Sequence, residues 1–127
     1  MGTDPPGPAA DSAKFEFATL KLLNGDQSAR ADIPFDVEAL VEASPERDGT
    51  PDAGACTVQF FCRNTSTSEA TRLGRVFADR VRDTNRYRAV LRCDGLQPGT
   101  YRIESAASMP SARDRFAYQR GPIFEVA

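Results

Sequence analysis

Hydrophobic and polar residues alternate along most of this chain in short runs, the pattern of strands that bury one face. The clearest run spans residues 35–43, where every second residue from Phe35 onward is apolar and three of the residues between are acidic. Further alternating runs, bounded by turn residues, cover 14–23, 56–62, 86–93, 100–107 and 119–126. The apolar positions change parity within 14–23, which predicts a bulge there. The pattern predicts an all-β protein.

One segment, 69–83, fits two kinds of element. Leu73, Phe77 and Val81 stand four residues apart, a spacing that suits one face of a helix and also one face of a strand. A helix would have to place Gly74 in its interior, at a cost of roughly 1 kcal/mol. We expect extended structure here, which brings the number of predicted strands to about seven.

The N-terminal residues 1–12 are rich in proline and glycine and hold no large apolar residue after Met1. This composition predicts a disordered N-terminal lead. We expect a single β-sandwich domain over 13–127. No apolar run approaches the roughly 20 residues that cross a bilayer, so no membrane association is expected.

A tyrosine follows a Pro-Gly turn in the segment 96–103, and the motif lies between two alternating runs. In many β-sandwiches a tyrosine at this place secures the crossover between sheets, because its hydroxyl donates a hydrogen bond to the backbone upstream. We therefore predict that Tyr101 is buried and that it bonds a backbone group within roughly six residues upstream. Leu96 should lie in the core beneath it.

Residues 86–126 carry a family resemblance that includes this motif. Its parts are Tyr87-x-Ala89-x-Leu91, then Leu96-x-Pro98-Gly99-x-Tyr101-x-Ile103, and then Gly121-Pro122-Ile123-Phe124-Glu125-Val126. This order resembles the last three strands of immunoglobulin-like and fibronectin type III-like domains, although the antibody disulfide pair and any tryptophan are missing. The resemblance implies an all-β fold, an about seven-stranded immunoglobulin-like antiparallel β-sandwich with a tyrosine-corner turn. It implies no particular function.

The net charge of −2 conceals an uneven distribution. Residues 1–62 hold four basic and eleven acidic side chains, whereas residues 63–120 hold twelve arginines and six acidic side chains. Such a split can indicate an anionic partner, or the two halves can neutralise each other in the fold. Immunoglobulin-like topology makes 35–43 and 86–93 antiparallel neighbours, so we expect their outward carboxylates and arginines to pair. A nucleic-acid partner is therefore not expected.

The composition also restricts the chemistry. The chain contains no histidine, so it lacks histidine general bases, Ser-His and Cys-His nucleophiles, and imidazole metal ligands. Three cysteines, Cys56, Cys62 and Cys93, cannot complete a four-sulfur zinc site and are expected as free, buried thiols in a reducing cytoplasm. We expect no enzyme activity and no cofactor.

These observations favour a non-enzymatic binding or assembly module that acts through protein–protein contacts at loops or a sheet face. A small-ligand or carbohydrate-binding sandwich is the alternative. Immunoglobulin-like topology gathers the loops at 44–55, 83–85 and 108–118 at one end. The last loop contains residue types that are enriched at interfaces, so the predicted protein-partner site consists of Met109, Arg113, Arg115, Phe116 and Tyr118. The other interpretation of the two aromatic residues is that they belong to the final strand and pack inward.

Overall fold

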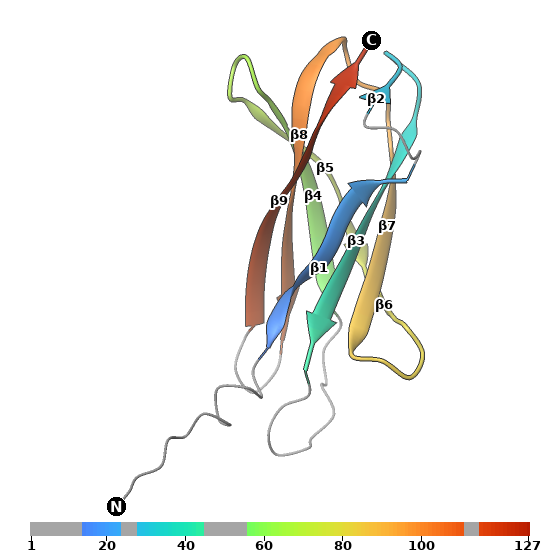
Figure 1. Ribbon diagram of the computed structural model, residues 1–127, viewed down its shortest axis with the longest axis vertical. Helices are drawn as coiled ribbons and strands as arrows, with labels where there is room; N and C mark the ends of the chain where they lie inside the picture. Colours follow the sequence, from blue (N-terminus) through green and yellow to red (C-terminus); the bar gives the residue numbers. More distant parts are fainter. Residues whose placement is uncertain (1–13, 24–27, 45–55, 111–114) are drawn as a thin grey trace, which may run out of the picture.

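The computed structural model describes residues 14–23, 28–44, 56–110 and 115–127. All regular elements in these ranges are β-strands, and they form two sheets that pack face to face (Figure 1). The prediction of an all-β protein is confirmed. The described residues include no helix that is long and apolar enough to cross a membrane. The predicted N-terminal lead lies outside the described residues.

The first sheet has four strands in the order β1-β3-β7-β6, and all neighbours are antiparallel. Its strands are β1 (Phe15–Leu22), β3 (Phe35–Ala43), β7 (Arg86–Cys93) and β6 (Asp79–Arg80). The register between β1 and β3 shifts between Phe17 and Thr19. This irregularity is the bulge that the change of parity predicts.

The second sheet has five strands in the order β2-β9-β8-β4-β5. Its strands are β2 (Ser28–Ala29), β9 (Arg115–Val126), β8 (Gly99–Met109), β4 (Thr57–Asn64) and β5 (Ala70–Phe77). The short β2 pairs with β9 in parallel, and the other neighbours are antiparallel. The ambiguous segment 69–83 is extended, as expected, and forms β5 and β6. The described residues thus form nine strands rather than about seven, because β2 and β6 are two-residue strands too short to produce an alternating pattern.

The hydrophobic core lies between the two sheets and is built from the inward residues of each strand. Burial alternates residue by residue along the whole of β3, as its sequence predicts. The largest fully buried side chains include Phe60, Ile103 and Phe124 from the second sheet. All three cysteines are free and buried, so that prediction is confirmed as well. They fill the core as small apolar side chains.

The crossover from β7 to β8 is secured by the predicted tyrosine. Tyr101 is 8% exposed, and its hydroxyl donates a hydrogen bond to the carbonyl of Gln97, four residues upstream, at 2.9 Å. Leu96 packs against the core. The ring of Tyr101 stacks on Phe124 at a centroid distance of 5.8 Å, and Phe124 contacts Phe35 of the first sheet at 5.8 Å. The tyrosine turn is confirmed, and it joins the two sheets at this end of the molecule.

Candidate functional site

The outward face of the five-stranded sheet combines exposed aromatic side chains with arginines. Alternate residues of a strand point to opposite faces, so the residues between the buried positions of β4, β5, β8 and β9 all share this face. We call it the outer sheet face and define it by Thr57, Gln59, Phe61, Arg63, Arg72, Arg75, Phe77, Arg102, Glu104, Ala106, Ser108, Phe116, Tyr118, Arg120 and Ile123.

Three aromatic side chains on the outer sheet face are open to solvent. Phe116 is 71% exposed, Phe77 is 65% exposed and Tyr118 is 51% exposed. Phe116 and Tyr118 are alternate residues of β9, so they are about 7 Å apart along the strand. Their partners across the pair of strands are Ser108 and Ala106 on β8. Because these partners are small, the two aromatic rings are not covered from the side of β8.

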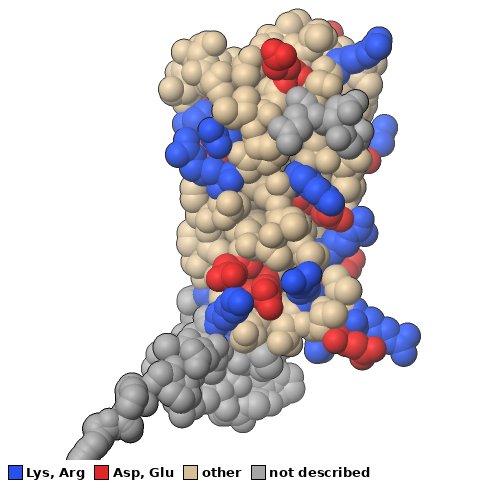
Figure 2. Space-filling model, in the orientation of Figure 1, with Lys and Arg blue, Asp and Glu red and all other residues tan. Residues whose placement is uncertain are grey.

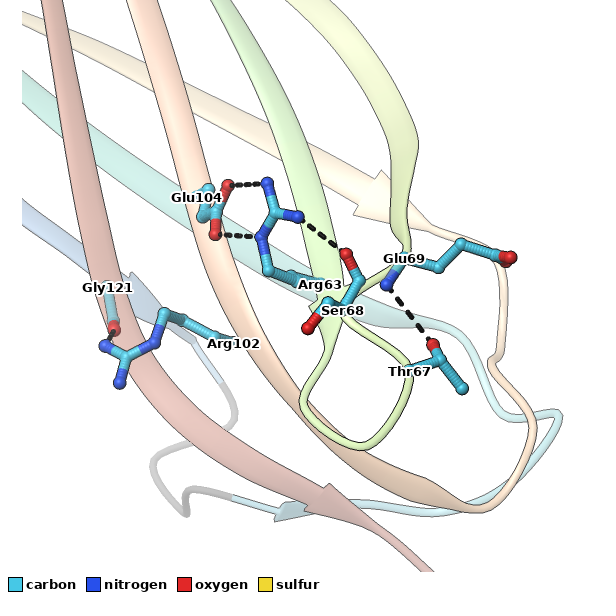
Figure 3. Close-up of polar contacts among 7 residues, drawn as sticks. All are labelled: Arg63, Thr67, Ser68, Glu69, Arg102, Glu104 and Gly121. Atoms are coloured by element: carbon cyan, nitrogen blue, oxygen red, sulfur yellow. Dashed lines mark hydrogen bonds and ion pairs between the residues drawn. The ribbon is translucent and has the colours of Figure 1, made fainter.

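Basic side chains outnumber acidic ones on the same sheet. The outward positions of its strands hold five arginines and two glutamates. Glu104 is one of the two, and Arg63 holds it in a bidentate ion pair with distances of 2.7 and 3.1 Å (Figure 3). Arg72, Arg75 and Arg120 form no ion pair with any carboxylate of the described residues. The outer sheet face therefore carries a net positive charge.

The guanidinium of Arg63 also fixes the hairpin between β4 and β5. Its Nη1 donates to the carbonyl of Ser68 at 2.7 Å, and Ser68 has a positive φ of 64° (Figure 3). The side-chain oxygen of Asn64 accepts hydrogen bonds from the backbone N–H groups of Ser66 and Thr67 at 2.8 and 3.1 Å. Arg63 thus connects β8, through Glu104, to the β4–β5 hairpin. Hydrogen bonds to the Asn64 side chain stabilise that hairpin internally.

The protonation states of Glu104 and Tyr118 follow from their contacts. A hydrogen bond from Arg63 is the main cause that lowers the pKa of Glu104, and a hydrogen bond from the Tyr118 hydroxyl lowers it further. Partial burial and the hydrogen bond to Glu104 raise the pKa of Tyr118. At neutral pH the carboxylate is ionised and the phenol is neutral. The Arg63 charge therefore cancels the Glu104 charge.

β9 contains a bulge on the outer sheet face. The register between β8 and β9 shifts between Arg102 and Glu104, opposite the segment that contains Gly121. A Cβ atom at Gly121 would lie 2.9 Å from the Leu20 side chain of β1, so a larger residue here would force that side chain to shift. Arg102 donates a hydrogen bond from Nη1 to the Gly121 carbonyl at 3.1 Å, across the bulge (Figure 3).

The outward face of the four-stranded sheet differs because its charges pair with each other. Acidic and basic side chains are interleaved over this sheet in Figure 2. β3 and β7 are neighbours, and Arg88 pairs with Glu38 while Arg92 pairs with Asp36 at 3.6 Å. The prediction that 35–43 and 86–93 neutralise each other is confirmed for these two pairs. It does not extend to the arginines of β5, because β5 lies in the other sheet.

The five residues predicted for a partner site lie in different surroundings. Phe116 and Tyr118 belong to β9, but both side chains face outward. Arg115 is partly buried and donates to a backbone carbonyl just after β3 at 2.6 Å. Met109 is fully buried in the core, where no partner can reach its side chain. Arg113 lies outside the described residues. The structure thus brings Phe116 and Tyr118 together on the outer sheet face and places the other two described residues elsewhere.

The predicted grouping of loops at one end is visible in the residues that border them. The N–H of Ala43 donates to the carbonyl of Asn85 at 2.8 Å, and Arg115 donates to the carbonyl of Ser44. The ends of three loops therefore meet. Residues 45–55 lie outside the described residues.

Sequence reasoning did not group Arg72, Arg75 and Phe77 with the two exposed aromatic residues of β9. The spacing of two between Arg75 and Phe77, and again between Phe116 and Tyr118, is a signal that each pair shares one strand face. Whether the outward faces of β5 and β9 belong to one surface depends on how the strands pair. Short-range sequence patterns do not contain that information.

The thiols offer no reactive group in the folded state. Burial raises the pKa of Cys56 and of Cys62 to about 11 and the pKa of Cys93 to about 12. The thiolate is the form that attacks substrates and binds metals, so these cysteines are unreactive at neutral pH. The described residues form no group of three or more side chains of the types that bind a metal ion.

The arrangement of the two sheets is similar to that of a class of solved enzymes, the superoxide reductases. Two structures of superoxide reductase (neelaredoxin) from Ignicoccus hospitalis show the likeness. One covers 96% of this chain and 92% of its own, at 17% identity and a TM-score of 0.51. The other covers 96% and 93%, at 16% identity and a TM-score of 0.51. The chain matches no protein-family model and no curated protein sequence. At this identity the likeness shows the fold alone.

This finding corrects two predictions. The resemblance to immunoglobulin-like and fibronectin type III-like domains is wrong, because the similar solved structures are superoxide reductases. A tyrosine turn between sheets is a local solution to a crossover, and it does not identify a family. The prediction of a non-enzymatic protein-binding module, with its carbohydrate-binding alternative, is also contradicted, because the structures that share the fold are enzymes.

The residues present do not fit the group that superoxide reduction requires. One-electron chemistry with oxygen species is carried out in proteins by a metal or an organic cofactor. The whole chain contains no histidine, and its three cysteines are buried as protonated thiols. Carboxylates of the described residues form no cluster that could replace them. We therefore derive no reaction step through a metal in this chain.

Proposed function

We propose that this chain binds an extended polyanion on its outer sheet face. The observation that supports the proposal is the charge of this face. Five arginines stand against two glutamates at the outward positions of these strands, and Arg63 neutralises Glu104. Arginine suits such a ligand because its planar guanidinium donates paired hydrogen bonds to phosphate and carboxylate groups.

The arginines are spread along the face, which favours a polymer over a small anion. Arg72 and Arg75 come from β5, Arg102 from β8 and Arg120 from β9. These strands are separated by up to three strand spacings, or about 14 Å. A polymer with repeated negative charges can contact several of these arginines at once and release a counterion at each contact.

The test is binding of dye-labelled polyphosphate, heparin and oligonucleotides, measured by fluorescence anisotropy over a range of salt concentrations. We expect affinity that falls steeply as salt rises. Arg72→Gln together with Arg75→Gln should weaken binding roughly tenfold or more, because two contacts are lost. The matched control is Arg86→Gln with Arg92→Gln, which removes the same charge from the opposite sheet.

The control variant should weaken binding less than roughly twofold. Equal losses in both double variants would show that net charge, and not the outer sheet face, attracts the ligand. Absence of salt-dependent binding to all three polyanions would overturn the proposal.

Superoxide reduction is the second candidate, and the likeness in fold over most of the chain is the observation that favours it. Each superoxide takes up one electron and two protons to become hydrogen peroxide, so an electron donor must be bound or supplied. The side chains that could bind a metal oppose this candidate, because the chain has no histidine and its three cysteines are buried.

A cytoplasmic location remains part of the proposal. Three free cysteines suit a reducing compartment, where they persist as thiols. Recognition of a protein partner, expected from the sequence, stays a prediction.

A further inference from the structure

We infer that the polyanion is a single-stranded nucleic acid, whose bases stack on Phe116 and Tyr118 while its phosphates contact the arginines of the outer sheet face. This inference rests on the proposed function, because the arginines would supply the charge-dependent part of the affinity. The additional observation is the aromatic side chains that lie open to solvent among those arginines.

Binding of phosphate alone does not explain the exposed aromatic rings. Large apolar side chains that are grouped on a surface commonly mark a binding site. Phe116, Tyr118 and Phe77 lie on one sheet face, and each is more than half exposed. An aromatic ring offers a stacking platform that any base can use, whatever its sequence. Arginines combined with such rings are the composition of a surface for single strands.

The geometry of β9 suits two consecutive bases. Phe116 and Tyr118 are separated by one residue, about 7 Å along the strand, and both point away from the core. Their cross-strand neighbours, Ser108 and Ala106, are too small to cover the rings. Both side chains are carried by β9, which β8 pairs through Ser108 opposite Phe116 and Ala106 opposite Tyr118, so the spacing of the two rings is set before the ligand arrives. A preformed platform lowers the entropy that binding costs.

Phe77 offers a third aromatic ring, at the other end of a row of cross-strand neighbours that begins at Phe116. The register places Phe77 beside Thr57, Thr57 beside Ser108, and Ser108 beside Phe116. Arg75 lies over the Phe77 ring at 5.9 Å from the centroid, so a cation is already held at this ring. Between the two phenylalanines the row contains only small hydroxyl-bearing side chains. A strand that crosses the sheet along this row would meet aromatic rings at both ends and hydroxyl groups between them.

A single strand fits this face better than a duplex does. In a duplex the base faces are stacked on one another, and sequence readers reach the bases through a groove. A sheet surface with exposed rings needs bases that are unstacked and turned outward, which single strands provide. An acidic polysaccharide would use the arginines and would gain no base stacking. These ligands are therefore distinguished by the aromatic residues, and not by the charge.

The experiment compares the full chain with a double variant, Phe116→Ala with Tyr118→Ala. The probes are a labelled single-stranded oligonucleotide, the duplex of the same sequence, and a heparin fragment. Loss of two stacked bases should weaken single-strand binding at least roughly tenfold. Heparin affinity should change less than roughly twofold. Val81→Ala with Val90→Ala removes exposed apolar side chains elsewhere and should change neither affinity.

Tyrosine fluorescence gives a second and direct measurement, since the chain has three tyrosines and no tryptophan. The single-stranded oligonucleotide should quench the emission, and the quenching should decrease in Tyr118→Phe, which removes the reporting tyrosine and keeps an aromatic ring for stacking. If the aromatic double variant binds the single strand as well as the unaltered chain, while Arg72→Gln with Arg75→Gln binds weakly, polyanion binding stands and base stacking is refuted. Preference for heparin would identify an anionic polysaccharide and refute the inference. Failure of all probes would overturn both proposals.

Discussion

Two tyrosines show how the surroundings of a residue decide what it does. Tyr101 is buried, and its hydroxyl holds a turn four residues upstream. Tyr118 is half exposed on the outer sheet face, where its phenol helps to lower the pKa of Glu104. The first role could be predicted because turn and tyrosine are close together in the sequence. The second could not, since Glu104 lies on a neighbouring strand beside a shift in register.

Replacement of the buried tyrosine tests this distinction. Tyr101→Phe should lower the free energy of unfolding by about 1–2 kcal/mol, because the carbonyl of Gln97 loses its hydrogen bond in a partly buried place. Tyr118→Phe is the matched control and should cost less, because the residue is 51% exposed and removal of its hydroxyl leaves no buried backbone carbonyl without its donor. Urea denaturation measures both values. Equal costs in the two variants would contradict the role assigned to Tyr101.

At the scale of strands, the alternation of residues gives the face of each strand but not its partner. The predicted bounds 35–43 and 86–93 coincide with β3 and β7, because strict alternation and flanking turn residues mark their ends. Their pairing also followed from the topology that the tyrosine turn implied. The place of β5 in the second sheet did not, since strand partners are chosen by long-range packing. The outer sheet face therefore could not be assembled from the sequence, although two of its aromatic residues were named.

The ion pair between Arg63 of β4 and Glu104 of β8 should give the stability of this sheet a pH dependence. Hydrogen bonding to Arg63 lowers the pKa of Glu104 in the folded state below its ordinary value of 4.5. The unfolded chain therefore takes up this proton first as the pH falls. The stability that the pair contributes is complete well above pH 4.5 and is lost as the pH falls through the lower, folded-state pKa.

The measurement is thermal unfolding of the chain and of Glu104→Gln over a series of pH values. The difference in Tm between the two should be largest near neutral pH and should shrink in acid, because the glutamine cannot ionise. Glu125→Gln, which removes an exposed carboxylate of β9, serves as the control, and near neutral pH it should change Tm less than Glu104→Gln does. A Tm difference that is constant from neutral to acid pH would show that Glu104 has the same pKa in both states.

At the scale of the whole molecule, the two sheets have separate roles. The four-stranded sheet neutralises its own charges, whereas the five-stranded sheet presents arginines and aromatic rings to solvent. The likeness to superoxide reductases concerns the arrangement of the two sheets. It does not determine the functional site, because the same fold supports different sites. The chain shares the arrangement of the sheets but lacks side chains suited to a redox metal. Above all, its sequence contains no histidine.

This separation predicts that the chain does not accelerate the loss of superoxide. The protein should be purified, incubated with ferrous, manganous or cupric ions, freed of unbound metal, and assayed for superoxide consumption with a supplied electron donor. We expect rates no higher than those of a control protein treated in the same way, because the chain has no histidine and its three cysteines are buried thiols that stay protonated at neutral pH. Protein-dependent consumption that disappears in Cys56→Ser, Cys62→Ser or Cys93→Ser, with folding preserved by circular dichroism, would refute this expectation. The fold would then carry a redox centre that depends on cysteine.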